Sequence, residues 1–478
     1  MSGRPPVRSS RLPHGPRFVH RLLAAGCVGL VGAGTLAFGA VYPWAHAPLG
    51  IGAAVAGLGC LIATRGGRPP LGSIAVALLL VAVGASLQLV PLPLAWVERI
   101  SPGTIAFGRA FDLSYQYGLA RHALSISPAD TVRGLCLFGS LALFMLGAAR
   151  LISTVGARAV ALPLVAFGTV LAGFGIAQYG LTANDVQPLI YGFWKPTFSS
   201  HPFGPFVNPN HFAGWMLMTV PLGLAAFLDG LTASMRSAPA GRSVRVALLG
   251  SPRLGGVVAS GGAVALMGLS IVLTRSRSAL AAFAVATLLI AWAVVRRQPT
   301  RQARLFAGAS AALLFLAIAI WAGGDAVLSK SLEAQSTKSA AMRMSAWKDA
   351  IAVVRRFPLT GTGLNTYGTA MMQYQTDQRA GHFREAHNDY LQIAAEGGLL
   401  LGVPVLAAIV VLIRQVRRRF REAPREGTTY WLRVGAVVGL ACIALQSIVE
   451  FSLQMPANAL LFALLAAVAI HRSPNLRE

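Results

Sequence analysis

The most constraining feature of this sequence is a series of twelve apolar runs, each long enough or nearly long enough to cross a lipid bilayer. The runs lie at 22–42, 47–63, 72–90, 132–152, 158–181, 209–229, 255–273, 279–295, 306–322, 395–413, 431–450 and 456–470. A membrane-spanning helix needs about 20 apolar residues, and a chain inside a bilayer must satisfy its backbone polar groups internally. The sequence therefore predicts an all-α polytopic membrane protein with about 12 transmembrane helices.

The composition excludes the main alternatives to a membrane protein. Hydrophobic residues make up 55% of the 478 residues and charged residues only 12%, and the mean hydropathy is +0.61. These values rule out a soluble enzyme and a disordered chain. The four cysteines all lie inside apolar runs, where a thiol behaves as a small hydrophobe. We expect no disulfide, no metal site and no cofactor.

The distribution of basic residues predicts the orientation in the membrane. With a cytoplasmic N-terminus, the inside segments hold 26 Lys and Arg residues and the short outside segments hold 6. Because cytoplasmic loops carry the excess of Lys and Arg, both termini are expected in the cytoplasm. The formal net charge of +25 then reflects orientation and contact with anionic membrane lipids, so no nucleic-acid partner is needed.

Three outside segments, about 91–131, 183–208 and 323–394, are too long to be simple turns. The predicted organisation is a basic cytoplasmic tail at 1–21, nine transmembrane helices within 22–322, a large periplasmic loop at 323–394, three transmembrane helices within 395–470 and a cytoplasmic tail at 471–478. Long loops are exempt from the charge rule. The basic residues of the largest loop are therefore candidates for ligand contacts, and function is expected at the outer face.

Two arginines, Arg275 and Arg277, follow the seventh run on the outer side, where the charge rule disfavours cations. In extended backbone, residues two apart point the same way, so both guanidinium groups could contact one diphosphate, for which Arg has suitable donors. The alternative is that both side chains extend to lipid phosphates at the outer surface.

A short amphipathic helix is expected to begin at Arg343 in the largest loop and to end before Pro358. Its predicted apolar face consists of Trp347, Ala350, Ile351 and Val354. We expect this face to lie on the membrane surface, with the Trp side chain at head-group depth. Arg343, one turn earlier, would then project toward the site.

A dense polar cluster precedes the tenth run and contains Glu385, His387, Asn388, Asp389 and Tyr390. The unperturbed pKa of a histidine, about 6.5, suits proton transfer near neutrality, and Glu385 and Asp389 are near enough in sequence to orient His387. The alternative is a purely structural histidine. A metal site is disfavoured because no second His lies three or four residues away and no Cys is nearby.

The start of the sixth run supplies Asn208 and Asn210. Asn-Pro-Asn is favourable turn and N-cap chemistry, and capping alone would explain both residues. A helix N-terminus that points into a site would also attract phosphate. Glu450, at the outer end of the eleventh run, is a carboxylate in apolar surroundings, and such residues mark functional sites by default.

Four motifs occur in order along the chain. They are Phe206–Gly214 (FVNPNHFAG), Ser276-Arg277, the series Arg343, Trp347, Ala350, Pro358, Gly361 and Gly363, and Ala386–Gln392 (AHNDYLQ). Over about residues 200–460 the chain thereby resembles the O-antigen ligase and O-antigen polymerase (Wzy-type) superfamily of bacterial membrane glycosyltransferases. The ordered set is specific, although each motif alone is not. Ser278 stands where family members often have Gly.

The resemblance implies a fold similar to the GT-C class, with many transmembrane helices and a large periplasmic loop. It also implies metal-independent transfer of a glycan from an undecaprenyl-diphosphate donor, at the periplasmic face of the bacterial inner membrane, to a hydroxyl of a glycan or lipid A core acceptor. Carried onto this chain, it implies Arg277 and Arg343 as diphosphate contacts and His387 as the base.

The residues found independently suit that chemistry. A lipid-linked glycan diphosphate already carries an activated leaving group, so a protein must hold the diphosphate and deprotonate the acceptor. The alternative function is a multi-span transporter or flippase of a lipid-linked or anionic substrate. Such folds usually show internal repeats and charges at the membrane midplane, whereas here the polar groups collect at the outer face. The sequence leaves the acceptor open between lipid A core, a growing polysaccharide and a protein side chain.

Overall fold

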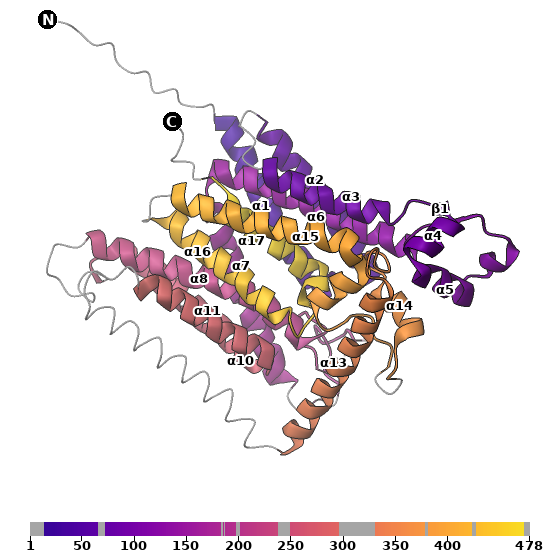
Figure 1. The fold of residues 1–478 in the computed structure, drawn as a ribbon. Coiled ribbons are helices and arrows are strands. Elements are labelled where there is room, and N and C mark those ends of the chain that lie inside the picture. The colour runs from indigo at the N-terminus through magenta and orange to yellow at the C-terminus, as the bar shows by residue number, and fades with distance from the viewer. Residues whose placement is uncertain are drawn as a thin grey trace, which may run out of the picture.

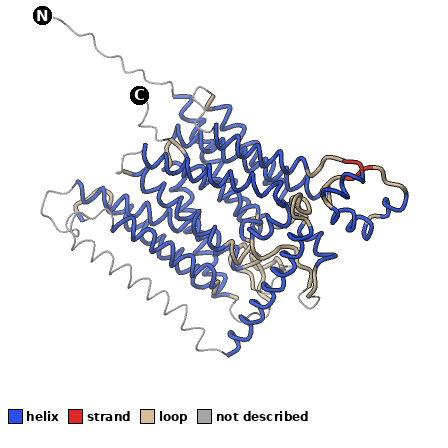
Figure 2. The backbone as a smooth tube through the Cα atoms, viewed as in Figure 1, coloured by secondary structure: helices blue, strands red, loops and turns tan. Residues whose placement is uncertain are grey.

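Helices dominate the computed structural model, which describes residues 14–65, 72–182, 185, 187–196, 201–237, 249–295, 330–377, 381–422 and 427–472 (Figures 1 and 2). Within these residues there is one small sheet, in which β1 (Leu92–Pro93) pairs antiparallel with β2 (Arg121–His122). The prediction of an all-α polytopic membrane protein is confirmed.

Nine helices in the described part of the chain are long and apolar enough to cross a membrane. They are α1 (His14–Leu36), α2 (Pro43–Ala63), α6 (Pro128–Val155), α7 (Arg158–Leu181), α8 (Pro209–Ser237), α10 (Leu254–Leu273), α11 (Arg277–Val295), α15 (Asp389–Glu422) and α16 (Thr428–Gln446). Two shorter apolar helices, α3 (Gly72–Leu87) and α17 (Pro456–Ile470), correspond to two further predicted runs. The ninth predicted run, 306–322, lies outside the described residues.

Helix α17 is the most buried element of the bundle, because it is apolar on all sides. Nearly all of its residues are buried, and it packs against α1, α6, α8 and α16. Its buried polar residue, Asn458, donates from Nδ2 to the backbone oxygen of His211 at 3.0 Å. The central helix therefore anchors the first turn of α8, where part of the candidate site lies.

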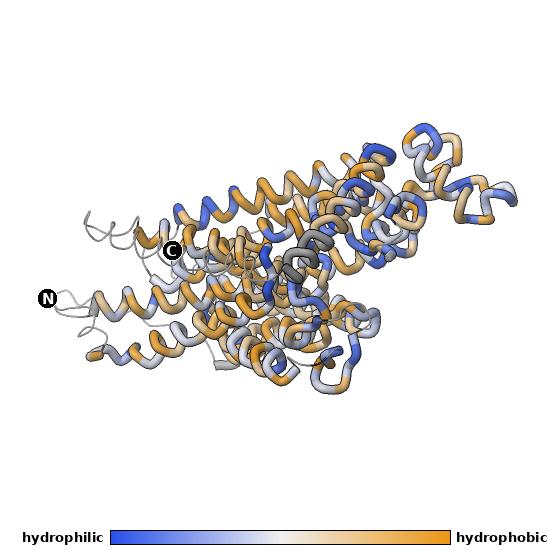
Figure 3. The backbone as a smooth tube through the Cα atoms, turned by 90° about the horizontal axis from the view of Figure 1, so that it is seen from below, coloured by the Kyte–Doolittle hydropathy of each residue, from blue (hydrophilic) through white to orange (hydrophobic). Residues whose placement is uncertain are grey.

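One end of the bundle carries most of the polar structure. Helices α13 (Lys330–Arg356) and α14 (Tyr367–Tyr374) lie there, together with the first residues of α8 and α15, and we call it the α13 end (Figure 1). The first residue of α1 and the last residue of α17 lie at the opposite end (Figure 1). Hydrophobic residues prevail along the long helices, whereas hydrophilic residues gather in the loops at the α13 end (Figure 3).

The outside segment predicted at 91–131 forms a small appendage at the α13 end, at the right of Figure 1. It consists of β1, α4 (Leu94–Ile100), α5 (Pro102–Phe111), the 3-10 helix η2 (Leu113–Tyr117) and β2. The appendage contacts the rest of the protein through α5, where Phe107 packs in a cluster with Ala346 and Phe357.

Helix α13 differs from the predicted amphipathic helix. It ends at Arg356 as expected, but it already begins at Lys330. Its buried apolar face includes Ala346, Ala350 and Val353 and continues into Phe357 just after the helix, whereas Ile351, which was assigned to the apolar face, is 40% exposed. The face is shifted because it packs against protein, including Tyr367 and Ala370 of α14. The expectation of a helix with its apolar face on the membrane surface was wrong.

Candidate functional site

The centre of the candidate site is an ion pair between Arg343 on α13 and Glu450, which follows α16. Nη2 of Arg343 donates to Oε1 of Glu450, and Nδ2 of Asn210, in the first turn of α8, donates to the same oxygen at 2.9 Å. Glu450 is 1% exposed, and its other oxygen, Oε2, has no hydrogen-bond partner among the described residues. Three segments that are distant in the sequence thus meet at one buried carboxylate.

The two asparagines at the start of α8 have different roles. Asn208 caps the helix, because its Oδ1 accepts the backbone N–H of Asn210 at 2.9 Å and its carbonyl oxygen accepts that of His211 at 3.1 Å. The capping interpretation therefore accounts for Asn208. Asn210 does more, since its side chain bonds directly to the carboxylate that holds Arg343.

His387 lies beside this ion pair in an unusual backbone conformation. Its φ is +51°, a left-handed value that costs a non-glycine residue on the order of 1–3 kcal/mol. Its carbonyl oxygen accepts the indole N–H of Trp347 on α13 at 3.2 Å, and its ring meets Phe451 edge to face, with centroids 4.7 Å apart. Nδ1 of His387 is buried and has no hydrogen-bond partner in the described part of the chain.

The residues on either side of His387 anchor this strained turn. Asn388 caps α15, because its Oδ1 accepts the N–H groups of Tyr390 and Leu391, each at 3.0 Å. The backbone N–H of Asp389 donates to the carbonyl oxygen of Ser447 at 3.0 Å. The hydroxyl of Tyr390 donates to the carbonyl oxygen of Ala444 at 2.7 Å. The first turn of α15 is thereby fastened to the end of α16.

The expectation that Glu385 and Asp389 orient the histidine was wrong. Glu385 accepts a hydrogen bond from Nε2 of Gln392 at 2.6 Å, and Asp389 accepts from the Ser447 hydroxyl at 2.7 Å and from Gln454 at 3.0 Å. Neither carboxylate bonds to His387. The left-handed backbone turns the imidazole toward Phe451 and Arg343 instead, so packing and backbone contacts fix its orientation.

Burial and charge set the protonation states of this turn. Burial, helped by the positive charge of Arg343, lowers the pKa of His387 to about 4, which keeps the imidazole neutral at physiological pH. Burial raises the pKa of Glu385 to about 8, and the carboxylates of Glu396 and Asp389 add to this rise against the opposing hydrogen bond from Gln392. The site therefore holds a neutral base next to a cation.

Arg275 and Arg277 lie at the α13 end but form no part of this cluster. Arg275 adopts a left-handed φ of +55°, and Arg277 is the first residue of α11. The hydroxyl of Ser276 between them accepts the N–H of Ala279 at 3.4 Å and caps that helix. The backbone between the two arginines is therefore not extended. Both arginines are exposed, and neither side chain forms a hydrogen bond or ion pair among the described residues.

Sequence reasoning did not identify His211 and Phe451 as parts of the site. The ring of Phe451 lies between two histidine rings, with centroids 4.7 Å from His387 and 4.7 Å from His211. Nε2 of His211 is buried and has no hydrogen-bond partner among the described residues. The signals were present, because His211 belongs to the FVNPNHFAG motif and Phe451 follows Glu450, but a pattern does not show that an aromatic ring separates two histidines.

The glycine turn after α13 is a second feature whose role the sequence did not reveal. Glu396 in α15 accepts the backbone N–H groups of Asn365 at 2.7 Å and Tyr367 at 3.1 Å. Gln88, just after α3, donates from Nε2 to the carbonyl oxygens of Thr360 and Glu396. The turn is thus pinned to α15 and to the end of α3, which sets the position of α13 and its arginine.

The arrangement offers donors for an anion and an acceptor for a proton. Arg343 and Asn210 supply N–H groups, and His387 supplies an imidazole nitrogen without a partner. Among the described residues, no group of three or more His, Cys, Asp or Glu lies close enough to hold a metal ion. A guanidinium beside a neutral base suits binding of a phosphate group and deprotonation of a nearby hydroxyl.

Comparison with known proteins bears directly on this arrangement. No curated protein matches the chain. A family model described as O-antigen ligase matches residues 262–406, a stretch that contains Arg275, Arg277, Arg343 and His387 and ends within α15. This part of the chain is therefore similar to the O-antigen ligase family, in agreement with the motifs that resemble that family.

Proposed function

We propose that this protein transfers a glycan from an undecaprenyl-diphosphate carrier to an acceptor hydroxyl at the periplasmic face of the bacterial inner membrane, without a metal ion. The observation that carries the proposal is the position of the Arg343 guanidinium beside the neutral imidazole of His387, whose Nδ1 atom is buried. The family match over residues 262–406 supports glycan transfer in general.

Arg343 is the proposed contact for the diphosphate. Glu450 and Asn210 hold its side chain in place before the donor binds, so little conformational entropy is lost on binding. A guanidinium presents a planar fork of donors that matches phosphate oxygens. As the bond between the sugar and the diphosphate breaks, negative charge grows on the leaving oxygen, and a cation fixed nearby stabilises it.

His387 is the proposed base. The oxygen of the acceptor hydroxyl attacks the anomeric carbon of the donor, its proton passes to the imidazole, and the diphosphate leaves with its lipid carrier. The low pKa of the free site keeps His387 ready to accept a proton. A bound diphosphate would offset the charge of Arg343 and raise the pKa of His387 toward its ordinary value, so the imidazole becomes a stronger base when the donor is in place.

Arg275 and Arg277 are proposed as further contacts for the anionic donor. Both guanidinium groups are exposed at the α13 end and are not engaged by other described side chains. They would meet the diphosphate as it approaches along the membrane surface. Contact with lipid phosphates is the competing role, and it predicts no loss of turnover when either residue becomes Lys.

The proposed orientation places both termini in the cytoplasm and the α13 end in the periplasm. The 26 to 6 division of basic residues supports it. The first residue of α1 and the last of α17 lie together at the end opposite to α13 (Figure 1), as this orientation requires. A reporter active only in the cytoplasm, fused near Gln375, should give no signal.

The experiment that tests the function uses the purified protein in nanodiscs with a lipid-linked glycan donor and a glycan or lipid A core acceptor. Arg343→Lys keeps the charge but loses the fork, so transfer should fall by roughly 10²-fold, a loss typical of removing one preorganised donor. Arg356→Lys, an exposed residue on the same helix, is the matched control and should transfer like the parent.

Three outcomes would contradict the proposal. Equal turnover by Arg343→Lys and the parent would remove Arg343 from the diphosphate contact. Loss of activity on adding a chelator would reject the metal-independent reaction. Movement of the lipid-linked donor across the bilayer without formation of a glycosidic bond would identify a flippase.

A further inference from the structure

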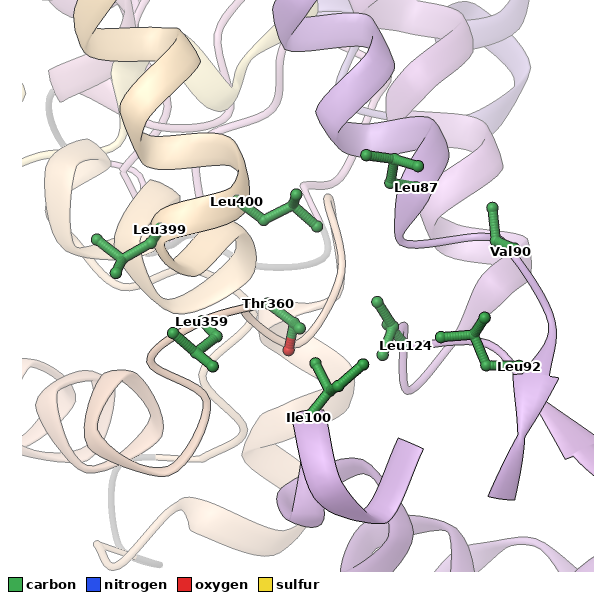
Figure 4. Close-up of a pocket in the computed structure, with 9 residues that line it drawn as sticks. All are labelled: Leu87, Val90, Leu92, Ile100, Leu124, Leu359, Thr360, Leu399 and Leu400. Atoms are coloured by element: carbon green, nitrogen blue, oxygen red, sulfur yellow. The ribbon is translucent and has the colours of Figure 1, made fainter. Parts of the chain in front are cut away.

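An apolar pocket at the α13 end takes no part in the proposed reaction. It has a volume of about 470 Å³ and lies between the end of α3, the appendage and α15 (Figure 4). Its lining consists of Leu87, Val90, Leu92, Ile100, Leu124, Leu359, Thr360, Leu399 and Leu400. The polar side chain of this set, Thr360, donates its hydroxyl to Ser101 at 3.1 Å. The lining therefore presents hydrocarbon and no polar side-chain group in need of a partner.

The backbone fixes the shape of this pocket. Gly398 interrupts α15 with φ +52° and ψ −151°, a conformation that is essentially restricted to glycine. The N–H groups of Leu399 and Leu400 then donate to the carbonyl oxygens of Pro358 and Leu359 at 2.9 and 2.8 Å. A Cβ on Gly398 would lie 2.5 Å from the backbone nitrogen of Gly361. The wall formed by Leu399 and Leu400 is thus preformed.

The pocket is continuous with the lipid-facing surface of two helices. Helices α3 and α15 pack together through Val81, Ala85 and Leu401, and their outward faces expose Leu79, Leu80, Val83, Leu399, Val403 and Leu406. Leu87 and Leu399 belong to this exposed surface and also line the pocket. Trp96 on α4 is 63% exposed, as expected of an aromatic side chain at head-group depth. The pocket therefore opens where the hydrocarbon of one leaflet meets its head groups.

We propose that this pocket binds an acyl chain of an anionic phospholipid. Its lining matches hydrocarbon, and Arg99, which is exposed and adjacent to Ile100 in the chain, offers a positive charge to the head group. The bound acyl chain would contact α3, the appendage and α15 together, so the lipid would help to hold the appendage against the bundle.

A phospholipid fits this position better than the polyprenyl donor. The volume of about 470 Å³ is near the lower end of the roughly 300–1,000 Å³ range of ligand pockets, which suits one acyl chain and not a long polyprenyl chain. Gly397, the last residue before this interruption of α15, is eight residues beyond Asp389, or roughly 12 Å at the helical rise. The pocket is therefore separate from the diphosphate position proposed at Arg343.

The test uses the full-length protein in nanodiscs of phosphatidylcholine that contain phosphatidylglycerol with a photoreactive acyl chain. After illumination, mass spectrometry should locate the adducts at residues 87–92, 359–360 and 399–400. Val90→Trp fills the pocket and should reduce these adducts roughly tenfold, as expected if about two methylene groups can no longer be buried. Val83→Trp, the same change on the lipid-facing side of α3, is the matched control and should label like the parent.

Further variants keep the result decisive. Val90→Ala enlarges the pocket and should retain labelling, which separates filling from misfolding. Arg99→Ala should remove the preference for phosphatidylglycerol over phosphatidylcholine. Arg343→Lys should be labelled like the parent, because Arg343 is outside the pocket. A failure of the lipid proposal can therefore be distinguished from a failure of the proposed function. Unchanged labelling of Val90→Trp would overturn the proposal, and so would displacement of the phosphatidylglycerol by undecaprenyl phosphate.

Discussion

Arginine side chains meet buried partners at both ends of the helix bundle, and the kinds of partner differ. At the α13 end, Arg343 bonds to the carboxylate of Glu450. At the opposite end, Arg419 and Arg433, each 1% exposed, donate from Nε to the carbonyl oxygens of Ile470 and Ala469 at 2.8 and 3.0 Å, and Arg419 also pairs with the carboxylate of Glu422. The last turn of a helix has carbonyl groups without intrahelical partners and a partial negative charge, so these two arginines cap the central helix α17.

The partners at the two ends indicate different roles for the arginines. Arg433 is a structural cation, whereas Arg343 is available to bind a ligand. A backbone carbonyl is part of the fold and cannot be replaced by a ligand. A carboxylate can be displaced by a stronger anion, and the polar atoms around Arg343 are incompletely paired, since Oε2 of Glu450 and Nδ1 of His387 have no partner among the described residues. An anionic ligand would pair with Arg343, and a hydroxyl group beside it could donate to the unpaired Nδ1 of His387.

The variant with the largest expected effect tests whether the reaction takes place at the α13 end. His387→Ala should reduce transfer by about 10² to 10⁴, the usual contribution of a general base, while donor binding is retained through the arginines. The loss should appear in turnover of lipid-linked donor by purified protein. His382→Ala, an exposed histidine of the same loop, is the control. Near-parental transfer by His387→Ala would remove its role as base, and loss of donor binding would make it a phosphate ligand.

The second prediction addresses the opposite end. Arg433→Gln leaves carbonyl groups at the end of α17 without donors, at a cost of about 1–3 kcal/mol for each buried group. We expect a lower melting temperature and lower expression, but unchanged transfer per folded molecule. Arg417→Gln, which changes an exposed residue of α15 at the same end of the bundle, should match the parent in thermal stability. A fall in the turnover of folded Arg433→Gln would show that the two ends are coupled.

The spanning helices could be predicted because hydropathy is a local property. Each described apolar run became a helix with bounds close to those expected. The basic residues were harder to interpret, since Arg419 and Arg433 look like topological charges in the sequence but are buried against α17. A count of basic residues uses only the segment in which each residue lies. It does not distinguish a side chain that faces lipid from one that caps a helix.

The candidate site was only partly predictable, because its geometry depends on tertiary contacts. The motifs identified Arg343, His387, Asn210 and Glu450, yet Arg343 and Glu450 are 107 residues apart, and no spacing rule pairs them. The left-handed conformation at His387 was also unpredictable, because such conformations are rare outside glycine. That single dihedral angle decides which groups face the imidazole.

The smallest expected effect concerns the pH dependence of the α13 end. Burial raises the pKa of Glu385 to about 8 in the folded protein, from an ordinary value of 4.5. A raised pKa means that the folded state retains a proton that the unfolded chain has lost, so the contribution of Glu385 to stability is full below about pH 4.5 and is lost as the pH rises through about 8.

Glu385→Gln removes this titration while it keeps a hydrogen-bonding side chain opposite Gln392. The melting temperature of the variant relative to the parent should therefore increase between about pH 5 and about pH 8, by roughly 1–2 °C for a half-buried group. Differential scanning fluorimetry in nanodiscs at several pH values measures it, and Arg384→Gln, an exposed neighbour, controls for the change in loop charge. A constant difference between Glu385→Gln and the parent across this range would mean that Glu385 titrates normally. In that case burial in this turn does not hold a proton on Glu385 at neutral pH, and the same burial would not lower the pKa of His387.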